Sequence, residues 1–446
     1  MAQISQQRSV RGDIALLHRR AGFGASPEEL DRLAPGGYEA AVEHVLSQLT
    51  TPNATGDALP LPAFTEFDQP DPTPDSAAKR QAQQARDQQR RQEGAALVEW
   101  WLSRMLTTTT PLREKLTLFW HGHFATSIQK VKYPQLMHTQ NELLRTSGPG
   151  GFEALAQAVA KDPAMLLWLD AATNSKAHPN ENFARELMEL FTLGIGNYSE
   201  RDVTEAARCF TGWRLDRKDW TFAFAPKDHD DGPKSVLGQT GAFGGEDVVH
   251  LATRSGASAR FIASKVWSHF ARPGGPDDPV VAPLAAAYAK DLDVTALLRA
   301  VFLHPEFRSD ATRAGLVKTP IEYVVGAVRA LQLKPTQQVV QGMAAVLKSL
   351  GQVPFDPPSV GGWPQNGYWL TTASSLSRLG FAELIVRNAD LSSVSRATGT
   401  ARVEAVARLL SLDTFTPATE GAFELVLDDP RSLVAVAMVS PEYVLA

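Results

Sequence analysis

Residues 178–194 read HPNENFARELMELFTLG and combine apolar and polar side chains at helical spacing. On a helical wheel, one arc is apolar and the opposite arc carries Asn182, Arg185, Glu186 and Glu189. Because an amphipathic helix needs a core to cover its apolar side, the stretch predicts a protein of packed helices. The apolar arc consists of Phe183, Leu187, Leu190, Phe191 and Gly194.

Helix signals continue on both sides of this stretch. GASPEELDRL at 24–33 places Ser26 as N-cap and Pro27 at the first helical position, and Ser199 with Asp202 forms a second capping pair. The one clear β signal lies at about 214–240, where WTFAF and SVLGQT are separated by turn residues. We therefore predict a mainly α protein, with one large multi-helix domain and a small inserted β-ribbon.

The domain organisation follows from composition. Residues 1–50 form a helical segment, and residues 51–76, which are rich in Pro, Asp and Thr, form a loop. Residues 77–446 form the main helical domain. Its first helix is polar all round at the start and becomes apolar near Trp100, where it should enter the core.

Composition excludes several classes of function. Hydrophobic residues make up 43% and charged residues 21% of the 446 residues, which is typical of a globular protein. The net charge of −5, with both signs interspersed, predicts no nucleic-acid partner. Cys209 is the single cysteine, which excludes an intrachain disulfide and a cysteine-based zinc site. Without an 18-residue apolar run or an apolar leader core, we expect no membrane span and a cytoplasmic chain.

Two carboxylates and two imidazoles are the candidate catalytic groups. Glu186 and Glu189 are three residues apart on the polar arc, and WHGHF at 120–124 supplies His121 and His123. An H-x-H pair is a common metal-ligand spacing, and these two glutamates supply the further donors it needs. The four residues are therefore both the catalytic and the metal candidates, and a divalent metal is the candidate cofactor. Two non-functional explanations stay open: the polar arc is a solvated helix face, and the histidines only interact with the dipole at the end of their helix.

The same four groups suggest two mechanisms. Either a metal held by them activates water, or one glutamate acts as a general acid whose pKa its neighbouring carboxylate raises. Arg185 would pair with Glu189 or bind an anionic group of the substrate.

The candidate substrate-binding residues surround these groups in the sequence. Asn182 and Arg185 lie on the polar arc, and His178 lies at the entry to its helix. His229, Asp230 and Lys234 belong to KDHDDGPK at 227–234, and Trp213 and Trp363 lie near chain breaks, where aromatic rings stack on sugars. The structural alternatives are an ordinary acidic turn and tryptophans that belong to the core.

Four groups of motifs in this order resemble the bacterial family catalogued as domain of unknown function 1800. They are LLHRRAGFGASPEELDRL at 16–33, LTLFWHGHFATS at 116–127, NENFARELMELFTLG with TEAARCFTGWRL at 180–215, and DPPSVGGWPQNGYWLTTASSLSRLGFA at 356–382. DDPRSLVAVAMVSPEYVLA at 428–446 also fits. The resemblance implies a mainly α-helical fold and no established reaction. Many relatives are exported and neighbour genes for secreted sulfatase-like or phosphatase-like proteins, which points toward envelope or polysaccharide metabolism and leaves export open.

We therefore predict a hydrolase or lyase, with or without a divalent metal, that acts on a polar glycan-like or phosphorylated substrate through the His/Glu cluster. The alternative is a non-catalytic helical scaffold, or a module that binds glycan or protein. The sequence makes no prediction of oligomeric state.

Overall fold

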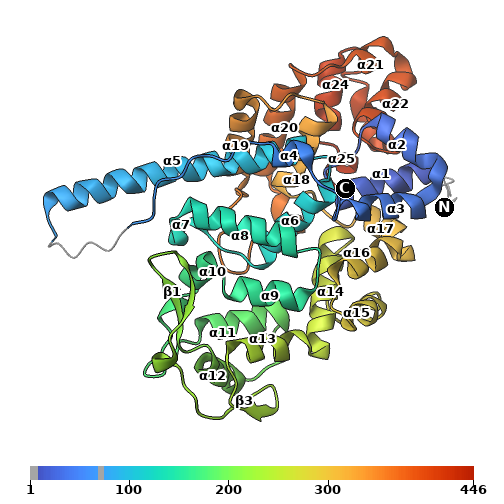
Figure 1. Ribbon diagram of the computed structural model, residues 1–446. Coiled ribbons are helices and arrows are strands. Elements are labelled where there is room, and N and C mark those ends of the chain that lie inside the picture. The colour runs from blue at the N-terminus through green and yellow to red at the C-terminus, as the bar shows by residue number, and fades with distance from the viewer. Residues whose placement is uncertain (1–8, 69–74, 446) are drawn as a thin grey trace.

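Helices dominate the computed structural model, which describes residues 9–68 and 75–445. The mainly α prediction is confirmed (Figure 1). The first half contains α1 (Val10–Ala21), α2 (Pro27–Leu33), α3 (Gly37–Ser47), α4 (Ala54–Asp57), α5 (Ala77–Thr107), α6 (Pro111–His123), α7 (Ile128–Val131), α8 (Pro134–Ser147), α9 (Phe152–Ala160), α10 (Pro163–Trp168), α11 (Asn182–Glu186) and α12 (Glu200–Cys209). The second half contains α13 (Gly245–Thr253), α14 (Gly256–Phe270), α15 (Val281–Ala289), α16 (Val294–Leu303), α17 (Asp310–Arg313), α18 (Pro320–Ala330), α19 (Gln337–Leu350), α20 (Thr372–Val386), α21 (Ser392–Arg396), α22 (Gly399–Leu409), α23 (Pro417–Phe423), α24 (Pro430–Ala437) and α25 (Pro441–Val444).

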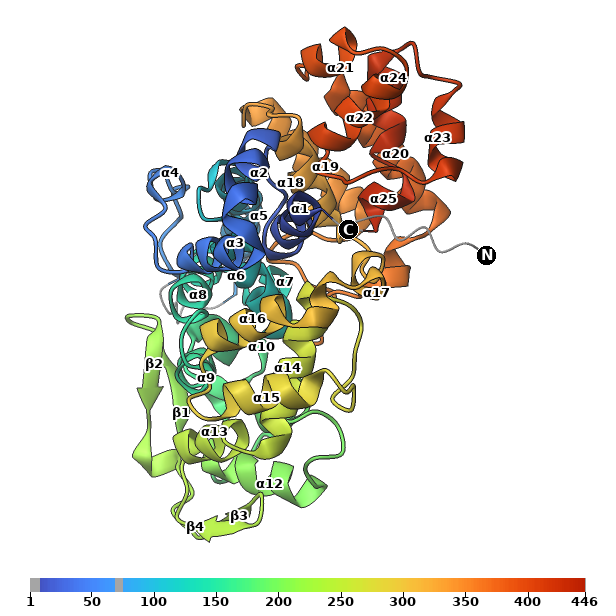
Figure 2. The same ribbon diagram turned by 90° about the vertical axis from the view of Figure 1, so that its right-hand side faces the viewer.

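Two hydrophobic clusters form the core, and α6 contributes to both. Trp120 of α6 packs in the first cluster with α1–α3 and α9–α16. Leu118 of α6 packs in the second cluster with α5 and α18–α25. In Figure 2, α6 accordingly lies between the helices of the two groups. Residues on the different sides of α6 therefore face different parts of the molecule.

The inserted β-ribbon is confirmed and consists of two separate hairpins. β1 (Trp213–Asp216) pairs antiparallel with β2 (Thr221–Phe224), with Trp213 opposite Phe224. β3 (Lys234–Val236) pairs antiparallel with β4 (Gln239–Gly241), with Lys234 opposite Gly241. Figures 1 and 2 show both hairpins at the end of the molecule that is remote from α20–α24.

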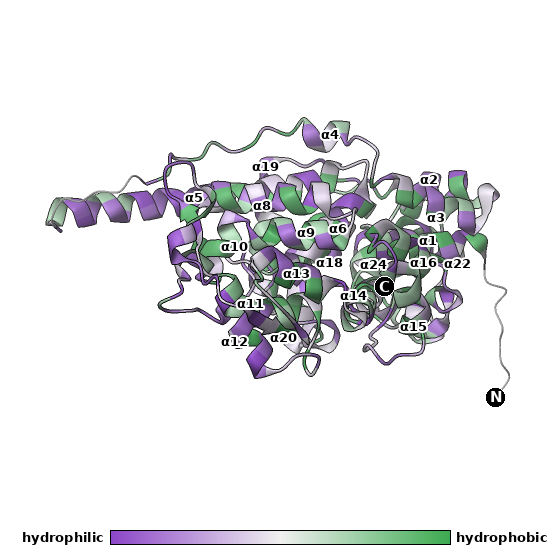
Figure 3. Ribbon diagram, turned by 60° about the horizontal axis from the view of Figure 1, so that its bottom comes forward, coloured by the Kyte–Doolittle hydropathy of each residue, from purple (hydrophilic) through white to green (hydrophobic). Residues whose placement is uncertain are grey.

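Helix α5 begins away from the core, and its second half enters it. Ser76 caps its N-terminus by accepting a hydrogen bond from the backbone N–H of Lys79. Its buried residues begin only at Arg90 and continue to Met105. Figure 3 shows the free first half as a largely hydrophilic helix that projects beyond its neighbours. None of the helices in residues 9–68 and 75–445 has the length and apolar character that crossing a bilayer requires.

The segment around Glu186 is less regular than the single helix that its periodicity predicts. α11 ends after Glu186, and a π-helix, η3 (Leu187–Thr192), follows it directly. The backbone N–H groups of Leu193 and Gly194 both donate to the carbonyl of Met188, and the Thr192 hydroxyl donates to the carbonyl of Leu187. The helical wheel, which assumes 3.6 residues per turn, therefore misplaces the side chains after Glu186.

The division into residues 1–50, 51–76 and 77–446 stays a prediction, and residues 1–8, 69–74 and 446 of it lie outside the described part. Within the predicted loop, α4 forms one short helix whose N-cap is Asn53. The Asn53 side chain donates to the hydroxyl of Thr108, 3.0 Å away, which ties this segment to the end of α5.

Candidate functional site

His121 and His123 lie in the last turn of α6, and backbone groups engage both of them. The Nε2 atom of His121 accepts a hydrogen bond of 3.0 Å from the backbone N–H of Phe355. The Nε2 atom of His123 donates to the carbonyl oxygen of Phe191 over 2.9 Å, since a carbonyl can only accept. Burial lowers the pKa of both imidazoles to about 3. Both rings are therefore neutral near pH 7, which also rules out a charge interaction with the helix dipole.

The two glutamates are engaged elsewhere. Glu189 accepts a hydrogen bond of 2.7 Å from the hydroxyl of Tyr198. Glu186 is half-buried, and burial together with the Glu189 carboxylate raises its pKa. Within the described residues, no three His, Cys, Asp or Glu side chains are arranged to hold a metal ion. His121 and His123 turn to backbone partners instead of to Glu186 and Glu189, so the described residues do not bring the four predicted ligands together, and a bound metal stays a prediction.

The remaining residues of the predicted polar arc have structural partners. Arg185 forms ion pairs with Glu200 at 2.8 Å and with Glu181 at 3.1 Å, so its predicted pairing with Glu189 is wrong. Asn182 donates to the carbonyl of Leu169 at 3.1 Å. The bidentate contact that α12 offers through Glu200 outcompetes a pairing within one helix.

The predicted residues of the ribbon stabilise the hairpins. His229 donates from Nδ1 to the carbonyl of Thr211 at 2.8 Å, and Asp230 accepts from Nε of Arg208 at 2.8 Å. The buried Lys234 ammonium donates to the carbonyl oxygens of Asp230 and Phe243. These interactions are those of an ordinary ordered turn.

Two other predicted residues lie in unlike surroundings. His178 is exposed, and its backbone pairs with Ser175. Trp213 is 1% exposed and packs edge-on against Phe210 and Phe222, with ring centroids 4.9 and 5.1 Å away. A tryptophan in the core offers no face to a sugar.

Trp363 is the predicted substrate-binding residue that the fold brings to His123. Both line a small cavity of about 100 Å³, and the Trp363 ring also packs against His121 with centroids 5.5 Å apart. Gly362 makes this approach feasible. Its φ is +80°, and a Cβ atom there would lie 2.4 Å from the carbonyl oxygen of Gly122. The backbones of the WHGHF and VGGW stretches therefore touch directly.

A larger cavity of about 460 Å³ is lined by residues of α1, α6, α18 and α25. This volume is in the range of small-molecule sites. Six basic side chains line it against two carboxylates, and we call it the basic cavity. The basic residues are Arg19, Arg20, Lys115, Lys318, Arg329 and Lys334, and the carboxylates are Glu29 and Glu322.

The negative charge of Glu322 is already balanced by an ion pair within the basic cavity. Its carboxylate accepts from the Lys115 ammonium and, at 2.8 Å, from the backbone N–H of Thr319. Although burial favours the neutral acid, Lys115 and His269 hold the pKa of Glu322 at about 2. The Glu322 carboxylate is thus ionised at neutral pH, and it is already engaged with Lys115.

Arg19 and Arg20 reach the basic cavity from the end of α1 and contact only backbone carbonyl groups. Arg20 donates to the carbonyl of Thr312 at 2.6 Å, and Arg19 donates to the carbonyl of Ser411. In both side chains Nε is buried, and no acceptor lies within hydrogen-bond distance of it among the described residues. Each arginine therefore keeps a buried N–H donor without a partner. Because buried donors are nearly always hydrogen-bonded, this N–H group calls for a further acceptor.

Lys318 and His269 complete the polar wall. The Lys318 ammonium lies 3.4 Å from the centroid of the Tyr443 ring, and burial together with Arg19 sets its pKa well below the ordinary value. Burial and Lys115 lower the pKa of His269 to about 4, and its buried Nε2 has no hydrogen-bond partner within the described part of the chain. His269, Leu316 and Glu322 line the basic cavity and the small cavity alike, so the two cavities adjoin.

The model of the family described as protein of unknown function (DUF1800) matches residues 16–445. The chain belongs to this family. Comparisons with curated proteins and with solved structures found no match.

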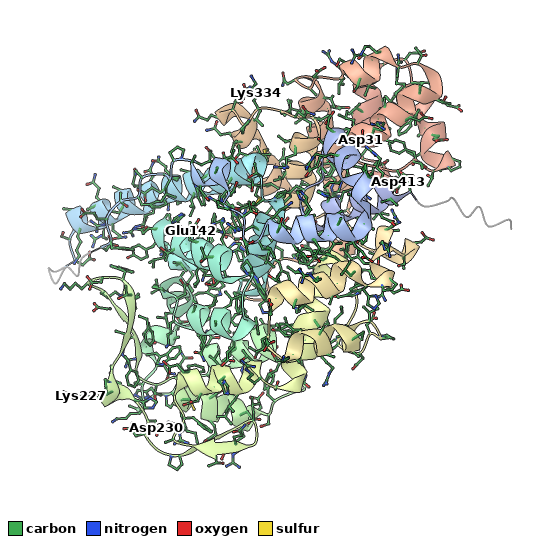
Figure 4. All side chains as sticks on the ribbon, turned by 45° about the vertical axis from the view of Figure 1, so that its right-hand side comes forward. Asp31, Glu142, Lys227, Asp230, Lys334 and Asp413 are labelled. Carbon is green, nitrogen blue, oxygen red and sulfur yellow. The ribbon has the colours of Figure 1, made fainter. Side chains whose placement is uncertain are left out.

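Most of the stretches that resemble the DUF1800 family line the two cavities, whereas the stretch at 180–215 lines neither. HRRAGFGAS supplies Arg19 and Arg20, and SPEYVLA supplies Tyr443. WHGHF and VGGWPQN supply His123 and Trp363 to the small cavity. The ribbon lies at the other end of the molecule, and Figure 4 shows Asp230 there, far from Lys334 at the rim of the basic cavity.

The basic residues of the cavity are not among the predicted site residues, because their surroundings in the sequence resemble those of residues with a purely structural role. Lys115 follows Arg113 and Glu114 at the start of LREKLTLFW, and Lys318 is the single basic residue of the mainly apolar stretch GLVKTPIEYVV. A lone lysine in a mainly apolar stretch is the signal that could have found Lys318, whereas Lys115 has no such signal.

Proposed function

We propose that the chain is an enzyme that binds a small anionic molecule, one that carries a phosphate or a carboxylate, in the basic cavity. The observation that carries this proposal is Arg20, a buried guanidinium that forms no ion pair with a carboxylate of the described residues. Lys318 lines the same cavity, is also buried, and has the Tyr443 ring beside its Nζ instead of a carboxylate.

The energetic argument is that an uncompensated buried charge destabilises a fold. Even after relaxation, the penalty is several kcal/mol per ion. A phosphate or carboxylate in the cavity would offset this penalty, and its oxygen atoms would satisfy the free Nε–H donors of Arg19 and Arg20. Of the predicted substrates, the phosphorylated class therefore suits this site better than a neutral glycan.

Of the two predicted reaction classes, we favour a lyase. The basic cavity offers a lysine amine and an unpartnered imidazole, whereas Glu322, one of its two carboxylates, is held in an ion pair with Lys115. A metal-dependent hydrolase of the predicted kind would need Glu186, Glu189, His121 and His123 together, and no metal-holding group of three such side chains is present in the described residues.

Inorganic phosphate provides the first test. At about 100 times its Kd, a ligand that binds only the native state raises the free energy of unfolding by about 2.7 kcal/mol. We expect phosphate to raise the Tm well beyond sodium chloride of equal ionic strength, and Arg20→Gln to abolish most of this effect.

Arg299→Gln is the matched control, because Arg299 forms an exposed ion pair with Glu43 far from the cavity. It should keep the full phosphate effect. A Tm that responds equally to phosphate and to chloride, or an undiminished response in Arg20→Gln, would refute the proposed site.

A further inference from the structure

The backbone of Lys318 is fixed at both of its polar groups. Its N–H donates to the carbonyl of Val444 at 2.9 Å, and its carbonyl accepts from Arg378 at 3.2 Å. Thr319, the next residue, caps α18. The root of the Lys318 side chain is therefore held rigidly, and the side chain projects into the wall of the basic cavity.

The amino group of Lys318 has a ring for a neighbour instead of an anion. Its Nζ lies 3.4 Å from the centroid of Tyr443, and no hydrogen-bond acceptor is recorded for it in residues 9–68 and 75–445. The ionised groups that face it are Arg19, Arg20 and Lys115, together with Glu322, which already accepts from Lys115. Since three cations and burial all oppose a charge on Nζ, the pKa of Lys318 lies well below its ordinary value.

The unprotonated form of a lysine amine is a nucleophile toward carbonyl carbon, and a lowered pKa enlarges the fraction of Lys318 in that form. Two arginines with free Nε–H donors lie in the same cavity and suit a carboxylate or a phosphate. One molecule that satisfies both features carries an anionic group for the arginines and a carbonyl group for the lysine. Binding through the anion would then bring the carbonyl carbon to Nζ.

We propose that Lys318 forms an imine with an anionic aldehyde or ketone, such as a 2-oxo acid or a phosphorylated carbonyl compound, bound in the basic cavity. This inference rests on the proposed function, because it needs the anion to bind there. Nζ attacks the carbonyl carbon and forms the C–N bond. The carbonyl oxygen then leaves as water with the two protons of the amine, so that no oxidant or reductant takes part. The imine withdraws electrons from the neighbouring carbon–carbon bond, which is the chemistry of a lyase.

Reductive trapping tests the imine directly in the full-length protein. The protein is incubated with glyoxylate or with dihydroxyacetone phosphate, sodium cyanoborohydride is added, and intact mass and peptide maps are recorded. We expect Lys318 to gain the mass of the carbonyl compound minus one oxygen, because water is lost when the imine forms and two hydrogens are added when it is reduced, and labelling should approach one adduct per chain. The two probes separate carboxylate from phosphate as the anionic group.

Variants and an uncharged probe sharpen the result. Lys318→Arg keeps a cation but loses the nucleophile, so the adduct should vanish, whereas Lys348→Arg on exposed α19 should keep it. Propionaldehyde, which lacks an anion, should label Lys318 much more slowly than glyoxylate. If Lys318→Arg fails to fold, the peptide map of the native protein still identifies the labelled lysine.

The outcomes separate this inference from the proposed function. Label spread over surface lysines, or none on Lys318 while phosphate still raises the Tm, would overturn the imine and leave anion binding intact. Label on Lys318 that propionaldehyde matches in rate would overturn the anionic substrate class. Absence of both the label and the phosphate effect would overturn the inference and the proposed function together.

Discussion

Replacement of Glu114 by Gln offers a quantitative test of the packing around α6. Glu114 is fully buried, and its Oε1 atom accepts from Nε of Arg104 at 2.6 Å and from Nε of Arg145 at 3.0 Å. Its Oε2 atom accepts from the Trp101 indole at 3.0 Å and from Nη2 of Arg145 at 3.1 Å. One carboxylate thus joins α5, α6 and α8.

The Glu114→Gln substitution preserves the shape of the side chain but removes its charge. It also replaces one carboxylate oxygen, which accepts hydrogen bonds, by an NH2 group, which would face the N–H donors of the neighbouring side chains. Removal of one partner from a buried ion pair destabilises by about 3–5 kcal/mol. Arg104 keeps a contact of 2.6 Å with Asp57, and Arg145 keeps its contact with Glu142. Because these contacts leave neither arginine wholly unpaired, we expect a loss of about 4 kcal/mol, which is a large part of a typical 5–15 kcal/mol.

Urea denaturation followed by circular dichroism measures this loss. Glu142→Gln is the matched control, because Glu142 pairs with the same arginine from a side chain that is 37% exposed, and its loss should be below about 1 kcal/mol. Although burial opposes it, Arg145 and Arg104 lower the folded-state pKa of Glu114. Its contribution is therefore present above the unfolded pKa and fades as the pH falls through the folded pKa. A Glu114→Gln loss no larger than that of Glu142→Gln would refute the reasoning.

Three further predictions concern single buried groups. Lys318→Met should abolish trapping and raise the ligand-free Tm at pH 7, because it removes an amine whose folded-state pKa is depressed. This gain in stability over the wild type should shrink as the pH rises toward about 10, where the lysine of the unfolded chain also loses its proton. Burial raises the pKa of Asp162 from 3.8 to about 7, so the free energy of unfolding of the wild type should fall by up to about 4 kcal/mol as the pH rises from about 4 to 7. Asp162→Asn removes the titrating group and should flatten this pH dependence. Gly362→Ala should destabilise by about 2 kcal/mol or more, because Gly362 has a positive φ and faces Gly122. Gly361→Ala should be nearly neutral, because a Cβ atom there meets only the Ser359 hydroxyl, at a van der Waals distance of 3.6 Å.

Each of these predictions has a contrary result in the same denaturation assay. A less stable Lys318→Met would mean that the ammonium is better compensated than its surroundings indicate. Parallel pH profiles for wild type and Asp162→Asn would exclude a raised pKa at Asp162. Equal stabilities of the two glycine variants would mean that the chain around Gly362 relaxes at little cost.

Local signals in the sequence predicted the local structure well. Ser26 accepts from the backbone of Glu29 with Pro27 at the helix start, and Ser199 and Asp202 form a complete capping box. Each of these features depends only on residues within one turn, so that spacing alone reveals it. The π-helix after Glu186 was not predicted, because its hydrogen bonds join residues five apart, whereas a helical wheel assumes the α-helical spacing of four.

The basic cavity could not be read from the sequence, because its contacts join distant segments. Lys115 and Glu322 are 207 positions apart, and Arg19 and Ser411 are 392 apart. Spacing along the sequence instead points to the polar side of one helix, where charged residues cluster. The assembled site instead takes one or two cations from each of several mostly apolar elements, and only tertiary packing brings these together.

The meeting of α1 with α25 has a consequence for biosynthesis. Arg19 and Arg20 leave the ribosome long before Tyr443, which covers the Lys318 amine. A nascent chain that has reached only α24 would lack both this ring and the Val444 carbonyl that anchors Lys318. The reactive amine should therefore acquire its final surroundings only after translation has passed these residues, which would protect a half-made chain from untimely reaction with cellular carbonyl compounds.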